Sequence, residues 1–194
     1  MRLPKVPRFL KLPLFAIDIA ENSYKYLSLE QSHGGIRLVT SGEGKIPQGT
    51  IQNSEIREQG ALRAILQDLF QKNYVRFVAC SLPDERGFIR SLKLLKTNVK
   101  KEEIGSALSL QLDAHIPLPP SEVVFDYTLV SEEGDHFDIV LRAFPRALVD
   151  SYCQVIAEAG ALPIFVEPKL GAIARAIIPR GTTESSILLN INST

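Results

Sequence analysis

The stretch LFAIDIAENSYKYLSLE, residues 14–30, decides the predicted fold. An apolar run, a short turn over residues 20–23 and an alternating run predict two strands joined by a tight turn. Asp18 lies near the end of the first strand, and Lys25 follows seven residues later. Such a turn can direct backbone N–H groups at a phosphate, while a carboxylate holds Mg²⁺ through water and a lysine adds positive charge. The same two residues also fit an ordinary hairpin surface.

The rest of the sequence alternates between strand and helix patterns. A helix is predicted from an N-cap at Asn53 or Ser54 through Phe70. The other predicted elements are strands over residues 35–41, 74–82, 88–95, 123–130, 137–144, 162–167 and 186–191, and helices over residues 100–115, 145–160 and 168–178. Since an apolar strand normally has a neighbour that continues its sheet, the last strand predicts a truncated chain.

This order divides the chain into three predicted parts. Residues 1–13 form a basic N-terminal arm. Residues 14–84 and 162–194 form one domain together with the start of a second lobe, and residues 85–161 form a small βαββα insertion within that domain. The basic arm could approach an anionic membrane surface, or it could be a solvated chain terminus.

Composition excludes several classes of function. Lys plus Arg and Asp plus Glu each total 22, so the chain lacks the basic footprint of a nucleic-acid-binding protein. No segment reaches the roughly 18 apolar residues of a membrane span, which predicts a cytoplasmic chain. Cys80 and Cys153 are predicted to be small buried apolar residues, and the three histidines are predicted to lie on the surface: His33, His115 and His136.

The order of strands and helices resembles that of the actin-like ATPases, the superfamily of FtsA, MreB and Hsp70. This resemblance implies an α/β fold: an actin-like ATPase (RNase H-like) subdomain with a mixed sheet, interrupted by a βαββα insertion of the 1C or SHS2 type. It implies a phosphate-1 turn for ATP at Asp18, Asn22, Ser23 and Lys25, with Asp18 also holding Mg²⁺ through water. Ala20 stands where the superfamily usually has glycine, and its Cβ would crowd a phosphate.

Two further segments bear on this predicted nucleotide site. The segment that begins Phe165-Val166-Glu167-Pro168 resembles one in Hsp70 and MreB whose acidic residue faces the attacking water, which implies a catalytic role for Glu167. Glu167 fits equally well as a strand-end residue that favours the dipole of the next helix. The phosphate-2 turn would comprise Asn190, Asn192, Ser193 and Thr194. Asparagine replaces the usual aspartate and glycine there, so ATP and Mg²⁺ are implied ligands of a degraded site and hydrolysis by this chain is not predicted.

The middle of the chain carries a narrower resemblance. His115-Ile116-Pro117-Leu118-Pro119 followed by the strand containing Asp126-Tyr127 resembles the PilM family, the cytoplasmic actin-like component of type IV pilus assembly. The resemblance implies a scaffold that docks the N-terminal tail of an inner-membrane partner, PilN, at the inner face of the inner membrane. Two alternatives stay open: a GspL-like cytoplasmic domain of type II secretion, and an active actin-like ATPase or FtsA-like filament protein whose second lobe is absent here.

Overall fold

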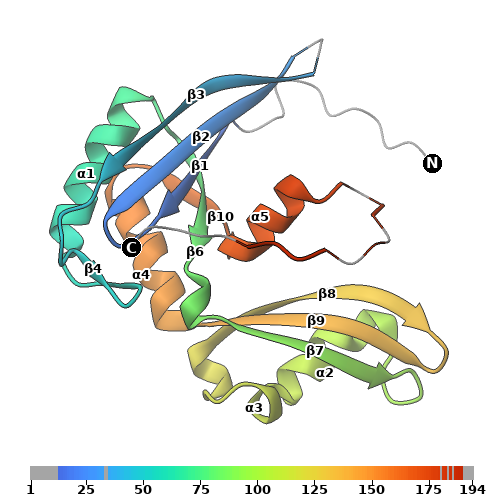
Figure 1. The fold of residues 1–194 in the computed structure, drawn as a ribbon. Helices are drawn as coiled ribbons and strands as arrows, with labels where there is room; N and C mark the ends of the chain where they lie inside the picture. The colour runs from blue at the N-terminus through green and yellow to red at the C-terminus, as the bar shows by residue number, and fades with distance from the viewer. Residues whose placement is uncertain (1–12, 33–34, 180, 183, 185, 190–194) are drawn as a thin grey trace. The chain divides into compact units, whose positions relative to one another are not determined.

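The computed structural model describes residues 13–32, 35–179, 181–182, 184 and 186–189. It divides the chain into two compact units (Figure 1). Unit 1 comprises Met1–Pro83 and Tyr152–Thr194, and unit 2 comprises Asp84–Ser151. The predicted domain boundaries at residues 84–85 and 161–162 stay a prediction.

A five-stranded sheet in the order β10-β6-β1-β2-β3 forms the centre of unit 1. β1 (Leu14–Ile19) pairs antiparallel with β2 (Ser23–Ser32), and β2 pairs antiparallel with β3 (Gly35–Lys45). On its other side, β1 pairs parallel with β6 (Phe77–Leu82), and β6 pairs parallel with β10 (Leu162–Pro168). The sheet is therefore mixed, as the sequence predicts.

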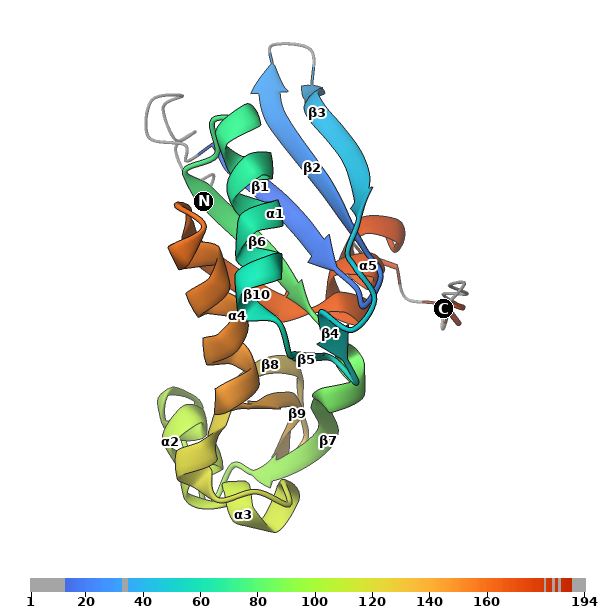
Figure 2. The same ribbon diagram turned by 90° about the vertical axis from the view of Figure 1, so that its left-hand side faces the viewer.

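Two helices cover one face of this sheet. α1 (Gln59–Lys72) and the part of α4 (Arg146–Glu158) after Ser151 lie side by side on that face (Figure 2). Alternate residues of β1 and β6 are buried, and the ring of Phe15 lies edge-on to that of Phe70 on α1, with 6.2 Å between centroids. The period-two pattern of apolar residues therefore identifies the helix-covered face.

α5 (Lys169–Ile177) lies on the other side of the sheet, behind the strands in Figure 2. It follows β10 directly, and Pro168 is its N-cap residue, with φ −58° and ψ 135°. A proline here costs the helix no hydrogen bond, because it precedes the first helical residue and its missing N–H has no acceptor in the helix.

The predicted start of α1 is wrong. Asn53 and Ser54 have positive φ values of 51° and 66° and form the turn between β4 (Ile51–Gln52) and β5 (Glu55–Ile56). The helix begins at Gln59, with Glu58 as its N-cap residue. Asparagine and serine serve both as N-caps and in the positive-φ turns of two-residue hairpins, so the local pattern did not separate the two structures.

The predicted strand over residues 186–191 is also not formed in the described part of that segment. Residues 186–189 are not in a strand, and residues 190 and 191 lie outside the described part of the chain. A strand needs a partner for its backbone hydrogen bonds, and no described strand pairs with this segment.

Unit 2 contains a three-stranded antiparallel sheet in the order β7-β9-β8. Its strands are β7 (Phe88–Leu95), β8 (Val123–Glu133) and β9 (His136–Pro145). The predicted helix over residues 100–115 is divided into a 3₁₀ turn, α2 (Ile104–Leu110) and α3 (Leu112–His115). Their apolar residues pack on the sheet in one buried cluster that includes Ile104, Leu108, Leu112, Ile116, Ile139 and Leu141.

None of the helices in the described residues is long and apolar enough to span a membrane.

Candidate functional site

A row of polar side chains crosses the sheet of unit 1 on the face that α1 does not cover. Strand register places Glu167 of β10 beside Ser81 of β6, and Ser81 beside Asp18 of β1. Asp18 is opposite Lys25 of β2, and Lys25 is opposite Glu43 of β3. Residues in register project from the same face of a sheet, so these five side chains form one line, which we name the polar row. It lies at the carboxyl ends of β1, β6 and β10, the edge where open α/β sheets bind ligands.

Asp18, at the centre of the polar row, has a partner for each carboxylate oxygen. The Ser81 hydroxyl donates a hydrogen bond of 2.5 Å to Oδ1. The Lys169 ammonium lies 2.9 Å from Oδ2. The exposed fractions of the Asp18 and Lys169 side chains are 31% and 25%, so this ion pair is largely shielded from water. Shielding strengthens the attraction relative to a fully exposed pair.

Glu167, at the β10 end of the polar row, is held by Arg175 of α5. The guanidinium donates from Nη1 to Oε2 at 2.6 Å and from Nη2 to Oε1 at 2.5 Å. This bidentate geometry is the strong form of an arginine–carboxylate pair. The hydrogen bonds to Glu167 raise the pKa of Arg175 above its usual value. Both cations that contact the row through α5 are therefore paired with carboxylates.

The turn between β1 and β2 borders a cavity of about 710 Å³. The Ala20 N–H closes the turn by donating to the Ser23 carbonyl at 2.8 Å, and the Asn22 carbonyl accepts from the Ile46 N–H at 3.0 Å. The cavity is lined by Asn22, Ser23, Glu43, Gly44, Lys45, Ile46 and Gln48. Of the predicted phosphate-1 residues, Asn22 and Ser23 line this cavity, together with residues at the end of β3 that were not predicted to belong to the site.

The polar row does not fit a magnesium ion at Asp18. Mg²⁺ takes an octahedral shell of oxygen ligands and keeps several waters, so it requires space and a carboxylate whose negative charge is not already matched by another cation. Both oxygens of Asp18 have partners, and a divalent cation there would lie beside the positive charge of Lys169. Across the described residues, no group of three or more His, Cys, Asp or Glu side chains is placed to hold a metal ion.

The predicted site residues have different outcomes. The polar row contains Asp18, Lys25 and Glu167, and the turn contains Asn22 and Ser23. The predicted phosphate-2 residues lie outside the described part of the chain: Asn190, Asn192, Ser193 and Thr194. Their roles, and those of Asp18 and Glu167, stay predictions.

Four contributors to the site were missed from sequence: Ser81, Glu43, Lys169 and Arg175. Ser81 is the polar residue on the otherwise apolar strand β6, and a lone polar residue in such a strand could have indicated a site residue. Lys169 and Arg175 belong to the helix that follows Glu167, but only the fold shows which carboxylate each one meets.

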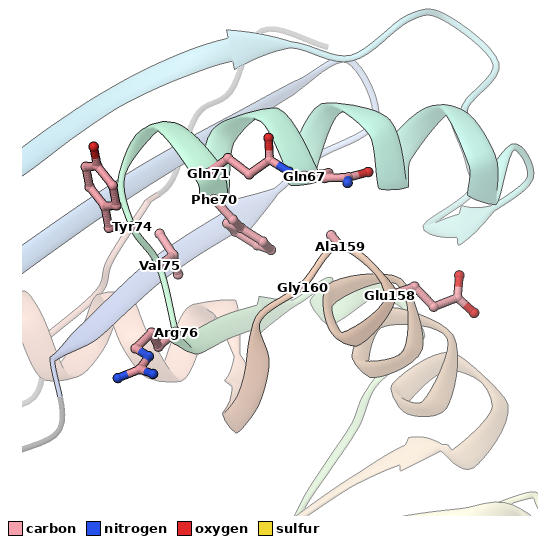
Figure 3. A pocket seen from close by; sticks show the side chains of 9 residues that line it. All are labelled: Gln67, Phe70, Gln71, Tyr74, Val75, Arg76, Glu158, Ala159 and Gly160. Carbon is pink, nitrogen blue, oxygen red and sulfur yellow. The ribbon is translucent and has the colours of Figure 1, made fainter.

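A second cavity, of about 540 Å³, lies between the C-terminal ends of α1 and α4. Figure 3 shows Phe70 at its centre, with the Arg76 and Glu158 side chains at opposite ends and pointing apart. Tyr74, at its rim, is 92% exposed and has φ of 54°. Binding sites for small molecules usually have a few converging polar groups. The charged side chains of this cavity point apart, so it does not have that arrangement.

Comparison with known proteins agrees with the fold. The family described as "Type IV pilus assembly protein PilM" matches residues 16–180. A solved PilM–PilN type IV pilus biogenesis complex has a TM-score of 0.75 at 19% identity, over 87% of this chain and 50% of that chain. The cytoplasmic domain of EpsL, an inner-membrane component of the Vibrio cholerae type II secretion system, has a TM-score of 0.53 at 15% identity, over 81% and 57%. No curated protein sequence matches the chain.

This chain thus spans about half the length of both solved structures. At these identities the likeness establishes the fold, and it confirms the predicted actin-like α/β class. The family match runs from within β1 to beyond the end of α5, and it includes the whole of the polar row. The chain therefore belongs to the PilM family of type IV pilus assembly proteins.

Proposed function

We propose that this chain is a cytoplasmic adaptor of type IV pilus assembly that docks the N-terminal tail of a PilN-like inner-membrane protein. The family match over residues 16–180 carries this proposal. The partner is supported by the solved complex of PilM with PilN, whose PilM fold this chain resembles. Docking to such a partner would hold the chain at the inner face of the inner membrane.

Peptide docking is compatible with the chemistry of the described residues. Capture of an extended peptide requires a groove or an open sheet edge and no catalytic groups. The sheet of unit 1 ends in β3 and β10, and the sheet of unit 2 ends in β7 and β8. Among the described residues, each of these edge strands pairs with a neighbouring strand on one side only, and an unpaired strand edge is where an extended peptide can add.

Two other functions receive less support. A GspL-like role in type II secretion is favoured by the fold likeness to the EpsL domain, but that TM-score of 0.53 is well below the 0.75 for the PilM–PilN complex. An active ATPase would need a metal near Asp18, where the geometry pairs both carboxylate oxygens within the protein. We therefore regard any nucleotide site in this chain as degraded.

Fluorescence anisotropy with a labelled peptide tests the proposal. The peptide is the cytoplasmic N-terminal segment of the PilN protein encoded in the same genome, and a scrambled peptide of identical composition is the control. We expect saturable binding with Kd below about 100 μM, which corresponds to about 5.5 kcal/mol. Equal anisotropy changes with both peptides, or no change at high micromolar protein, would contradict the adaptor function.

A further inference from the structure

We propose that Lys169 is a built-in counter-ion for Asp18, in the place where an actin-like site would hold its divalent metal. Through this pair and the Glu167–Arg175 pair, α5 is fixed on the sheet without a bound ligand. The proposal concerns the polar row alone and does not depend on peptide docking. It accounts for a disagreement between the nucleotide site implied by the superfamily and the residues present here.

The position of Lys169 follows from the register of the strands. Glu167 is in register with Ser81 on the neighbouring strand, and Ser81 is in register with Asp18 one strand further on. From the first residue of α5, the Lys169 side chain spans β6 and reaches Asp18 at 2.9 Å. Pro168 restricts the backbone immediately before it, with φ −58°. Strand register and a rigid residue therefore direct this ammonium to Asp18.

The Lys169 ammonium and a metal ion would compete for the same position beside Asp18. A lysine ammonium is a compact, strongly hydrated charge with three donors, and it neutralises a carboxylate without the geometric demands of Mg²⁺. Asp18 Oδ2 pairs with Lys169, while Oδ1 accepts from Ser81. Since the carboxylate is already neutralised, it has little attraction left for a second cation.

The formal charges in and around the polar row balance. Its carboxylates are Asp18, Glu43 and Glu167. Three cationic groups are in register with them or paired to them: Lys25, Lys169 and Arg175. The formal charges of these six groups sum to zero, since three negative and three positive charges cancel. Two of the three carboxylates, Asp18 and Glu167, are each paired with a cation of α5, and Glu43 is in register with Lys25.

NMR of the unmodified chain provides the decisive test. The carboxyl carbon of Asp18 and the amide of Ser81 are followed while Mg²⁺, and then Mg-ATP, is added to millimolar concentration. We expect neither signal to shift by more than surface carboxylates such as Asp68 do. A saturable shift confined to Asp18 and Ser81 would show that a metal binds there, and it would overturn the proposal.

A double-mutant cycle measures the interaction between Asp18 and Lys169 directly. Asp18→Asn, Lys169→Met and the double variant are compared by chemical unfolding, because methionine keeps an apolar stem and removes the charge. We expect the two changes to be coupled by about fivefold in the unfolding equilibrium constant. The matched control is the same cycle with Asp68→Asn and Lys72→Met, since Lys72 pairs with Asp68 at 2.6 Å on the exposed surface of α1. Coupling no larger than that of the Lys72–Asp68 pair would refute the assignment, and if a variant fails to fold, the NMR titration decides.

Discussion

The Tyr24 ring packs against Gly44, so a side chain added at Gly44 should lower the stability of the protein. Gly44 of β3 is opposite Tyr24 of β2, and the Tyr24 ring lies over the glycine backbone. A Cβ at Gly44 would lie 2.3 Å from Cζ and 2.4 Å from Oη of Tyr24. Carbon atoms in contact are about 3.5 Å apart, so Gly44→Ala must displace the ring by about 1 Å.

That displacement disturbs an aromatic pair. The Tyr24 and Tyr26 rings stack with 6.4 Å between centroids, and the Tyr26 ring in turn lies over Gly42. Loss of good aromatic packing costs about 0.5–1.5 kcal/mol, and overpacking adds strain. We expect Gly44→Ala to lower the free energy of unfolding by about 1–2 kcal/mol, or the melting temperature by about 3–6 °C. Circular dichroism during thermal unfolding measures this loss.

The same substitution should have the opposite effect once the ring is removed. In a Tyr24→Ala background, Gly44→Ala only restricts the unfolded chain, so it should stabilise the protein by about 0.5 kcal/mol. Gly60→Ala is the matched control, because a Cβ at that exposed position of α1 meets no atom within 4 Å. It should stabilise the helix by about 0.5–1 kcal/mol. Equal destabilisation by Gly44→Ala with and without the Tyr24 ring would refute the steric argument.

Two substitutions and one alkylation experiment test the packing and the charges. The buried Tyr152 hydroxyl donates to the Ser54 carbonyl at 3.2 Å, so Tyr152→Phe should cost about 1 kcal/mol in denaturant unfolding. Burial raises the pKa of the Cys80 thiol, so in timed alkylation with mass spectrometry Cys80 should react only on unfolding, after the partly exposed Cys153. The Ser131 hydroxyl, 2.6 Å from Asp138, is the main cause of that carboxyl's lowered pKa, so Ser131→Ala should raise the pKa toward its usual value in an NMR titration. A lowered carboxyl pKa stabilises the fold above the unfolded pKa, near pH 4, and this contribution is lost as pH falls, so the variant should lose less stability in acid.

Local sequence patterns predict where the strands of this protein lie, but they do not predict which distant side chains come into contact. The alternation in residues 14–30 predicts both strands of the first hairpin, because one buried face imposes a period of two. The sequence does not distinguish the turn at Asn53 and Ser54 from a helix start, since the same side chains stabilise both structures. The partners of Asp18 could not be predicted, because Ser81 lies 63 residues away and reaches it only through parallel pairing of β1 and β6.

Charge pairing within the polar row also bears on what kind of protein this fold supports. A ligand changes a conformational equilibrium only through a difference in its affinity for the two conformations. In a nucleotide-driven switch, metal and phosphate provide that difference by neutralising groups that are otherwise unpaired. Here α5 already supplies Lys169 to Asp18 and Arg175 to Glu167. With Lys169 as the counter-ion of Asp18 and Arg175 as that of Glu167, a nucleotide has little to add to the position of α5.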